Sequence, residues 1–345
     1  MRAMAERVTI VGDGAMATVC SILLTQGGHG VTMWGAFEES IERLMQDREQ
    51  RTLLPGARIP QGVRLTANDS QCFDDATMVL SAVPTQYMRP VWKRLAGYVP
   101  RGVPIVSVAK GIENKTLLRP TQIIADVLGG IPPGGTVPVC DWMLCAMSGP
   151  NIAAELARYL PATAVAAAVV PDVAERTQRV FSTEWFRVYT NQDVVGVELA
   201  GAMKNVIAIA AGIIDGLGAG NNAKAALVTR GLVEITRLGV AMGALPETFN
   251  GLAGLGDLIT TCVSPEGRNR TVGERIGKGQ KLDDILEGMD SIAEGVPTTQ
   301  SVRELARRYD VEMPITEAVH AVLFEQKDVL HALSELMTRE PKPER

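Results

Sequence analysis

Short strand-like runs of apolar residues alternate with a helix-like segment in the first half of the chain. Residues 8–11, 31–34, 78–83 and 104–108 have the length and composition of buried strands. Between the first two runs, Ala15–Gln26 has a helical pattern that ends at a pair of glycines. Strands that alternate with helices in this way predict a doubly wound, Rossmann-type parallel sheet.

Longer segments rich in alanine, glycine and leucine replace this pattern after residue 189. Helical periodicity extends over residues 194–214, 223–242, 248–260, 282–288, 299–309 and 316–323. The change of pattern lies at residues 190–193. We therefore expect an α/β chain in two domains, an N-terminal Rossmann-type domain over residues 1–190 and a C-terminal all-α domain over residues 191–340.

The loop after the first predicted strand reads G-D-G-A-M-A, in which Gly12, Gly14 and Ala17 match the G-x-G-x-x-A dinucleotide fingerprint. The first glycine permits a tight turn, the second lets a pyrophosphate approach the backbone, and the alanine allows close helix–strand packing. The helix N-terminus adds amide donors and a favourable dipole. This position between a strand and a helix favours NAD or NADP as the cofactor, and a glycine turn in a domain that binds another ligand is the alternative.

The end of the second predicted strand does not discriminate between the two cofactors. An NAD-preferring site usually places an acidic residue there, which binds the ribose 2′-hydroxyl. Here Gly35 and Ala36 hold the position, and no arginine stands there to bind a 2′-phosphate. Glu38 and Glu39 follow a turn too late. The sequence therefore leaves NAD versus NADP open.

Lys204 interrupts the apolar helix predicted over residues 194–214, and no acidic residue of that helix is placed to neutralise it. Its neighbours three and four residues away are glycine, alanine and isoleucine. Such neighbours remove water from a lysine, which lowers its pKa towards the range useful for proton transfer. A catalytic lysine is one interpretation, and a lysine that extends from a buried helix to solvent is the other.

Composition narrows the possible partners and chemistry. A globular composition with 46% apolar residues and a net charge of −5 argues against nucleic acid as the main partner. Five cysteines without a C-x-x-C pair and three histidines offer no metal-ligand spacing, so we expect no metal. Glu198 and Lys204 lie inside the segment of membrane-spanning length, which favours a core helix over a membrane span. The first strand begins too early for a signal peptide, so we expect a cytoplasmic protein.

Several longer strings follow one another along nearly the whole chain. They are S-V-A-K-G-I-E (107–113), S-G-P-N-I-A-A-E (148–155), F-R-V-Y-T-N-Q-D-V-V-G-V-E-L-A-G-A-M-K-N-V-I-A-I-A-A-G (186–212), T-R-G-L-V-E-I-T-R-L-G (229–239), G-L-A-G-L-G-D-L (251–258), R-N-R (268–270) and V-E-M-P-I-T (311–316). Together they resemble the soluble NAD(P)-dependent glycerol-3-phosphate dehydrogenases of the bacterial type.

The resemblance implies roles for individual residues. It makes Lys204 the catalytic proton donor and acceptor, Lys110 a second active-site lysine, and Asp257 and Asn205 their polar partners. It implies substrate contacts for Lys110, Gly149, Asn151, Lys204, Asp257, Arg268 and Asn269. It implies cofactor contacts, besides the fingerprint residues, for Ala15, Met16, Ala36, Lys110, Ala153, Arg268 and Glu294.

The residues themselves support these roles to different extents. Lys110 follows a predicted strand, at the end where open α/β sheets bind ligands, although a solvated lysine in a turn fits the same pattern. Asp257 follows the glycines of G-L-A-G-L-G and is either a helix cap or a partner that orients a desolvated lysine. Arg268 and Asn269 follow the turn-forming P-E-G; an arginine beside an amide suits a phosphate, and a solvated arginine is the alternative.

Some positions depart from the family pattern. Met16 replaces an aromatic residue, and Gly267 replaces a serine. Asn151 and Ile152 stand in place of a serine or threonine followed by phenylalanine. Because Asn151 and Gly267 change hydrogen-bonding groups beside the ligands, they bear on affinity more than on reaction type.

The expected reaction is the reduction of dihydroxyacetone phosphate to sn-glycerol 3-phosphate, the glycerophospholipid backbone, with hydride from NADH or NADPH. One alternative is another NAD(P)-linked hydroxyacid or sugar-phosphate dehydrogenase, which needs a carboxylate-reading site in place of Arg268 and Asn269. The other is a dinucleotide sensor without catalysis, against which the intact Lys204, Lys110 and Asp257 argue. The apolar helical domain favours a homodimer.

Overall fold

An eight-stranded sheet forms the centre of the N-terminal half of the computed structural model, which describes residues 5–129, 142–341 and 343. The strands are β1 (Arg7–Val11), β2 (Gly30–Trp34), β3 (Arg64–Thr66), β4 (Met78–Ser81), β5 (Ile105–Ser107), β6 (Leu144–Ser148), β7 (Ala162–Ala167) and β8 (Phe186–Asn191). Their order is β3-β2-β1-β4-β5-β6-β7-β8, and only β6 and β7 pair antiparallel. The first six strands therefore form the predicted doubly wound parallel sheet, whose strand order reverses between β1 and β4.

Two apolar cores lie on opposite faces of this sheet. The helices of this half are α1 (Ala15–Gln26), α2 (Glu38–Asp47), α3 (Thr85–Leu95), α4 (Pro120–Val127), α5 (Ala153–Ala157) and α6 (Pro171–Phe181). Because neighbouring strand residues point to opposite sides, Val106 packs in the core with α1 and α6, and Ile105 packs in the core with α3 and α4. Burial on both faces explains why the strands read as continuous apolar runs.

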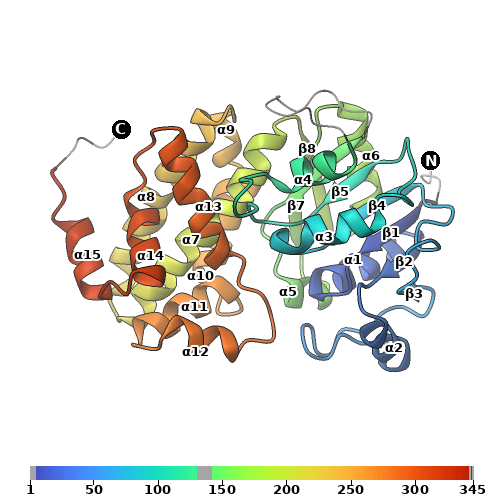
Figure 1. The fold of residues 1–345 in the computed structure, drawn as a ribbon, viewed down its shortest axis with the longest axis horizontal. Coiled ribbons are helices and arrows are strands. Elements are labelled where there is room, and N and C mark those ends of the chain that lie inside the picture. The colour runs from blue at the N-terminus through green and yellow to red at the C-terminus, as the bar shows by residue number, and fades with distance from the viewer. Residues whose placement is uncertain (1–4, 130–141, 342, 344–345) are drawn as a thin grey trace.

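The C-terminal half is helical and is built around α7, as Figure 1 shows. Its elements are α7 (Val194–Gly216), α8 (Gly220–Ala241), α9 (Pro246–Phe249), a π-helical turn (Leu252–Gly256), α10 (Asp257–Val263), α11 (Arg268–Gly277), α12 (Leu282–Glu287), α13 (Gly295–Arg308), α14 (Pro314–Phe324) and α15 (Val329–Met337). By length and composition alone α7 is apolar enough to cross a membrane, but its apolar window is 100% buried inside the protein. It is the core helix of this half.

Two predictions for the helical half were wrong in detail. The single helix expected over residues 248–260 is divided into α9, the π-helical turn and α10, and Gly254 lets the chain turn closely against the backbone of Phe249. Arg268 and Asn269, expected on a turn, are the first residues of α11. The glycines next to and within α11 interrupt its helical pattern in the sequence, so this helix was not predicted.

Close packing of α11 on α7 depends on glycines in both helices. Gly212 and Gly216 on α7, and Gly273 and Gly277 on α11, all face the backbone of the other helix. A Cβ atom on Gly273 would overlap the carbonyl oxygen of Ile209, so no larger residue fits without a shift of the helix. This contact brings the first turn of α11 against the middle of α7, where the candidate site lies.

Candidate active site

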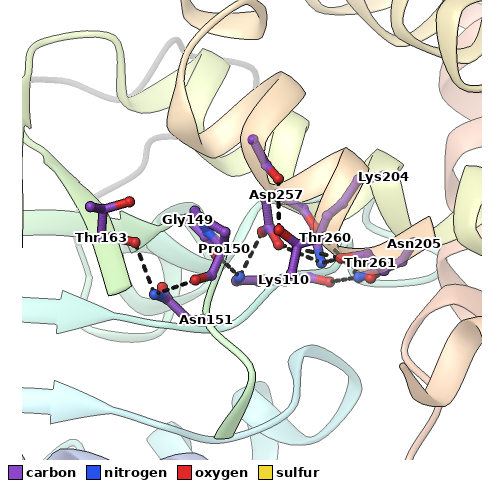
Figure 2. A network of polar contacts seen from close by, with 12 residues as sticks. Lys110, Gly149, Pro150, Asn151, Thr163, Lys204, Asn205, Asp257, Thr260 and Thr261 are labelled. Atoms are coloured by element: carbon purple, nitrogen blue, oxygen red, sulfur yellow. Dashed lines mark hydrogen bonds and ion pairs between the residues drawn. The ribbon is translucent and has the colours of Figure 1, made fainter. Parts of the chain in front are cut away.

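Five of the residues implied as catalytic or substrate-binding come together where the sheet meets α7 (Figure 2). Lys110 follows β5 and Gly149 follows β6, so both lie at the C-terminal ends of parallel strands. Lys204 and Asn205 lie in the middle of α7, and Asp257 is the first residue of α10. The site therefore combines the ligand-binding edge of the sheet with the core of the helical half.

One buried carboxylate joins the two lysines. The Oδ2 atom of Asp257 lies 2.7 Å from the Nζ atom of Lys110, and its Oδ1 atom lies 3.0 Å from the Nζ atom of Lys204. Lys110 also donates a hydrogen bond to the carbonyl oxygen of Gly149, at 2.8 Å. Asp257 thus orients a cation from each half of the molecule, in addition to opening a helix.

The environment of Lys204 shifts its proton affinity. Burial lowers the pKa of Lys204 to about 8, against the attraction of Asp257, which raises it, and with the repulsion of Lys110, which lowers it further. A lysine with this pKa exchanges a proton near neutral pH. Burial is therefore the main cause of the shift, in the direction that the sequence predicts, and Asp257 limits its extent.

Thr261 is a member of this network that the sequence analysis missed. Its hydroxyl accepts a hydrogen bond from Lys204 and lies 3.3 Å from Oδ1 of Asp257, to which it donates. Thr261 follows Asp257 by one helical turn of α10, so both side chains project from the same face. That spacing of four residues is the signal that identifies it in the sequence.

A chain of amides connects the lysines to the start of α11. Asn205 donates from Nδ2 to the carbonyl oxygen of Lys110 at 2.9 Å, and its Oδ1 accepts from Nδ2 of Asn269 at 2.9 Å. The Oδ1 of Asn269 accepts from the backbone N–H of Gly295 at 2.8 Å. Arg268, next to Asn269, is exposed and has no hydrogen-bond or ion-pair partner among the residues that the structure describes. The exposed guanidinium of Arg268 thus lies next to the hydrogen-bonded side-chain amides of Asn205 and Asn269.

Asn151, a predicted substrate residue, points away from the lysines in Figure 2. Its Nδ2 donates to the carbonyl oxygens of Thr163 and Pro150, at 2.9 and 3.0 Å. The preceding Gly149 has a φ of +149°, and a Cβ atom there would lie 2.8 Å from the carbonyl oxygen of Thr163. In this conformation the Asn151 amide fastens the end of β6 to β7, and it has no free donor towards Lys110.

The glycine loop has the shape that a dinucleotide pyrophosphate needs. Gly12 has a φ of +124°, and a Cβ atom there would lie 2.8 Å from the carbonyl oxygen of Ala82. Gly14 opens α1 without any side-chain cap, and a Cβ atom there would meet only Leu53, at 3.7 Å. Ala17 is buried against the sheet. The amides of the first turn of α1 are thus available to a phosphate, and the loop fits the predicted cofactor.

The other predicted cofactor residues surround this loop or lie at the contact between the halves. Ala15, Met16 and Ala153 pack against the core beside α1. Glu294, at the start of α13, accepts hydrogen bonds from the backbone N–H and hydroxyl of Thr85, at 2.9 and 3.0 Å. Glu294 therefore links the helical half to the N-terminus of α3.

Two charged side chains from other parts of the chain lie beside the end of β2. The carbonyl oxygen of Ala36 accepts a hydrogen bond from Nη1 of Arg94, at 2.7 Å, and the carboxylate of Asp13 lies against Gly35. Arg94 comes from α3 and Asp13 from the glycine loop, so neither is near residue 36 in the sequence. The end of β2 is neutral in its own residues, Gly35 and Ala36, but charged side chains lie beside it in the folded chain.

Two family models together match most of the chain. The model described as NAD-dependent glycerol-3-phosphate dehydrogenase N-terminus matches residues 7–174, and the model described as its C-terminus matches residues 193–334. The chain belongs to the NAD-dependent glycerol-3-phosphate dehydrogenase family. The resemblance stated from the sequence is confirmed.

Known members of this family match the chain over its full length. A protein of Salinibacter ruber named glycerol-3-phosphate dehydrogenase (NAD(P)+) 2 is 48% identical over 341 residues, which cover 99% of this chain and 97% of that one. A glycerol-3-phosphate dehydrogenase (NAD(P)+) of Geobacter sulfurreducens is 47% identical, with 99% and 100% coverage. The crystal structure of glycerol-3-phosphate dehydrogenase from Coxiella burnetii superposes with a TM-score of 0.91 at 31% identity, covering 98% of this chain and 100% of that chain. The predicted fold class is confirmed by this superposition.

Proposed function

We propose that this chain interconverts dihydroxyacetone phosphate and sn-glycerol 3-phosphate with NADH or NADPH, and that the reaction takes place beside Lys204. One observation carries the proposal at the level of residues. A buried lysine with a pKa of about 8 is oriented by Asp257 at the C-terminal edge of a sheet whose glycine loop fits a dinucleotide. Family membership supplies the substrate class.

Lys204 acts as the proton donor in the reducing direction. NADH or NADPH, held by the loop from Gly12 to Gly14, would supply the hydride that the carbonyl carbon of the substrate accepts. As negative charge develops on the carbonyl oxygen, the Nζ atom of Lys204 transfers a proton to it. Because the pKa of Lys204 is about 8, the lysine is largely protonated at neutral pH and still acidic enough to donate. In the oxidising direction the neutral amine accepts the proton from the alcohol.

Lys110 and Asp257 assist through charge and position. The ammonium group of Lys110 lies on the same carboxylate as Lys204, so it adds positive charge where the substrate oxygen becomes negative. Asp257 keeps both ammonium groups in position before the substrate arrives. Thr261 restricts the rotation of Lys204 through its hydrogen bond.

Arg268 and the N-terminus of α11 form the proposed site for the substrate phosphate. Arg268 is exposed, and it is the first residue of a ten-residue helix whose N-cap, Gly267, provides no side-chain cap. Amide donors, the helix dipole and a guanidinium all favour a phosphate at this place. Asn269 is anchored to Asn205, which fixes the distance between this site and the lysines.

Several further features of the proposal come from the family resemblance and from composition. We assign dinucleotide binding to residues 1–190 and substrate binding and catalysis to residues 191–340. The existence of separate family models for residues 7–174 and 193–334 supports a division of this kind. The product would enter glycerophospholipid synthesis, and the protein would act in the cytoplasm as a homodimer.

A spectrophotometric assay of cofactor oxidation tests the proposal. Purified protein is mixed with NADH or NADPH and, separately, with dihydroxyacetone phosphate, unphosphorylated dihydroxyacetone or a 2-oxo acid. We expect rapid oxidation with dihydroxyacetone phosphate and little with the other two substrates. A faster reaction with the 2-oxo acid would assign the chain to a different dehydrogenase activity. Cofactor binding without oxidation of any substrate would instead indicate a sensor.

A further inference from the structure

Asp13, the residue between the two fingerprint glycines, is held firmly by residues outside the fingerprint. The hydroxyl of Ser40, in the first turn of α2, donates to Oδ2 of Asp13 at 2.7 Å. The side-chain amide of Gln50 donates to the backbone carbonyl oxygen of Asp13 at 2.9 Å. Both the carboxylate and the backbone of Asp13 are therefore fixed before any ligand binds.

Gly35 provides the space that the Asp13 carboxylate occupies. A Cβ atom on Gly35, at the end of β2, would lie 2.8 Å from Oδ2 of Asp13 and 2.7 Å from Cδ1 of Ile41. An acidic side chain at position 35, the usual reader of the ribose hydroxyls, is therefore incompatible with this packing. The carboxylate at the strand end comes from the glycine loop instead.

The charge of Asp13 has no opposite partner at this strand end. Arg94 is the nearest candidate to attract a 2′-phosphate, but its Nε lies 2.7 Å from Oδ2 of Asp69 and its Nη1 is bonded to Ala36. Its guanidinium also lies over the ring of Trp34, at 5.0 Å. Asp13 has only the neutral Ser40 at its carboxylate, and no ion-pair partner within the described part of the chain. The local field at the end of β2 is therefore negative.

We propose that Asp13 sets the cofactor preference of this enzyme in favour of NADH. The free lone pairs of its carboxylate accept hydrogen bonds from the adenosine ribose, and its charge repels the 2′-phosphate of NADPH. The inference rests on the proposed function, because it requires the dinucleotide to bind on the loop from Gly12 to Gly14. It goes further because it assigns cofactor specificity to a residue of the glycine loop, whereas the acid that binds the ribose usually lies at the end of β2.

Adenosine fragments test this assignment without any chemistry. The affinities of 5′-AMP and 2′,5′-ADP, which differ only in the 2′-phosphate, are measured by calorimetry for the whole protein and for Asp13→Asn. The asparagine keeps the size and the hydrogen bond to Ser40 but removes the charge. We expect the parent to prefer 5′-AMP, and the variant to bind 2′,5′-ADP at least about tenfold more tightly relative to 5′-AMP. The kcat/KM ratio for NADH over NADPH should fall by a similar factor.

Glu38→Gln is the matched control, since Glu38 is an exposed acid in the same turn of α2 as Ser40. Glu38→Gln should leave unchanged both the ratio of fragment affinities and the kcat/KM ratio for NADH over NADPH. Thermal unfolding should show that Asp13→Asn and Glu38→Gln are both folded. If Asp13→Asn leaves the ratio of fragment affinities within twofold of the parent, Asp13 only links the loop to α2 and the inference is wrong. If the fragments behave as expected but dihydroxyacetone phosphate is not reduced, Asp13 keeps its role and the proposed substrate fails. If the parent binds neither fragment, the inference about Asp13 is wrong, and the oxidation assay alone decides the proposed function.

Discussion

Lys204 and Lys110 contact opposite oxygens of a single carboxylate, although one lies on the core helix of the helical half and the other follows a strand of the sheet. The two Nζ atoms lie 3.0 and 2.7 Å from the oxygens of Asp257. Burial and the neighbouring Lys110 both lower the pKa of Lys204, while Asp257 raises it, and the balance is a pKa of about 8. The proton affinity of Lys204 therefore depends on contact between the two halves.

The two directions of the reaction should show opposite pH dependence. Below a pH of about 8 Lys204 is protonated, which reduction requires, and above it the lysine is neutral, which oxidation requires. We expect kcat/KM for dihydroxyacetone phosphate reduction to fall, and kcat/KM for glycerol 3-phosphate oxidation to rise, as the pH passes through this value. Rates measured in both directions between pH 6 and 10 in the same buffers check this. Profiles that rise or fall together would exclude Lys204 as the titrating group.

Replacement of Asp257 should move that midpoint. The negative charge of Asp257 raises the pKa of Lys204, so Asp257→Asn should shift the midpoint of the reduction profile to lower pH, with a reduced maximal rate. Glu247→Gln, which removes an exposed acid on α9, is the control and should leave the profile unchanged. An unchanged midpoint in a folded Asp257→Asn variant would show that this carboxylate does not set the proton affinity of Lys204.

Arg268→Ala should weaken the productive binding of dihydroxyacetone phosphate. The loss of a charge-assisted contact to the phosphate predicts a fall in kcat/KM of roughly 10- to 100-fold. Unphosphorylated dihydroxyacetone, a poor substrate, should be affected far less. Lys278→Ala removes an exposed cation at the other end of α11 and should change neither. Equal losses on both substrates would mean that Arg268 serves the cofactor or the fold.

Gly273→Ala should destabilise the protein because α7 and α11 approach so closely. The added methyl group would overlap the carbonyl oxygen of Ile209, and overpacking of this kind costs about 1–3 kcal/mol. Helix propensity alone favours alanine by up to about 1 kcal/mol, so a net loss would isolate the steric effect. Gly62→Ala, at an exposed position with nothing within 4 Å of the new Cβ, should be neutral. The free energy of unfolding in urea measures both, and a neutral Gly273→Ala would refute the packing argument.

Periodic patterns explain which parts of the fold the sequence predicted. The bounds of α1 and the start of α7 agree with the prediction, since each has a long apolar pattern and a clear terminus. The periodic pattern did not predict α11, where glycines are needed for close packing. Gly273 and Gly277 suggest a loop in the sequence, but in the structure they allow α11 to pack on α7. The strands β3, β6, β7 and β8 were not predicted, and in β7 the alanines carry little strand preference.

The candidate site shows the same division between local and non-local information. The direction of the pKa shift of Lys204 was predicted from its apolar helical neighbours, and burial is its largest cause in the structure. The carboxylates that matter most, Asp257 beside the lysines and Asp13 beside Gly35, act on residues distant in the sequence. Family resemblance anticipated the first of these, and only the three-dimensional packing identifies the second.

The turnover of Lys204 variants tests the central claim most directly. We expect Lys204→Ala to remain folded and to bind NADH with little change, while kcat for dihydroxyacetone phosphate reduction falls by roughly two to four orders of magnitude. Lys204→Arg should fail as well, because a guanidinium does not release its proton in this pH range. A kcat within a few-fold of the parent in either folded variant would contradict the assignment of Lys204 as the proton donor.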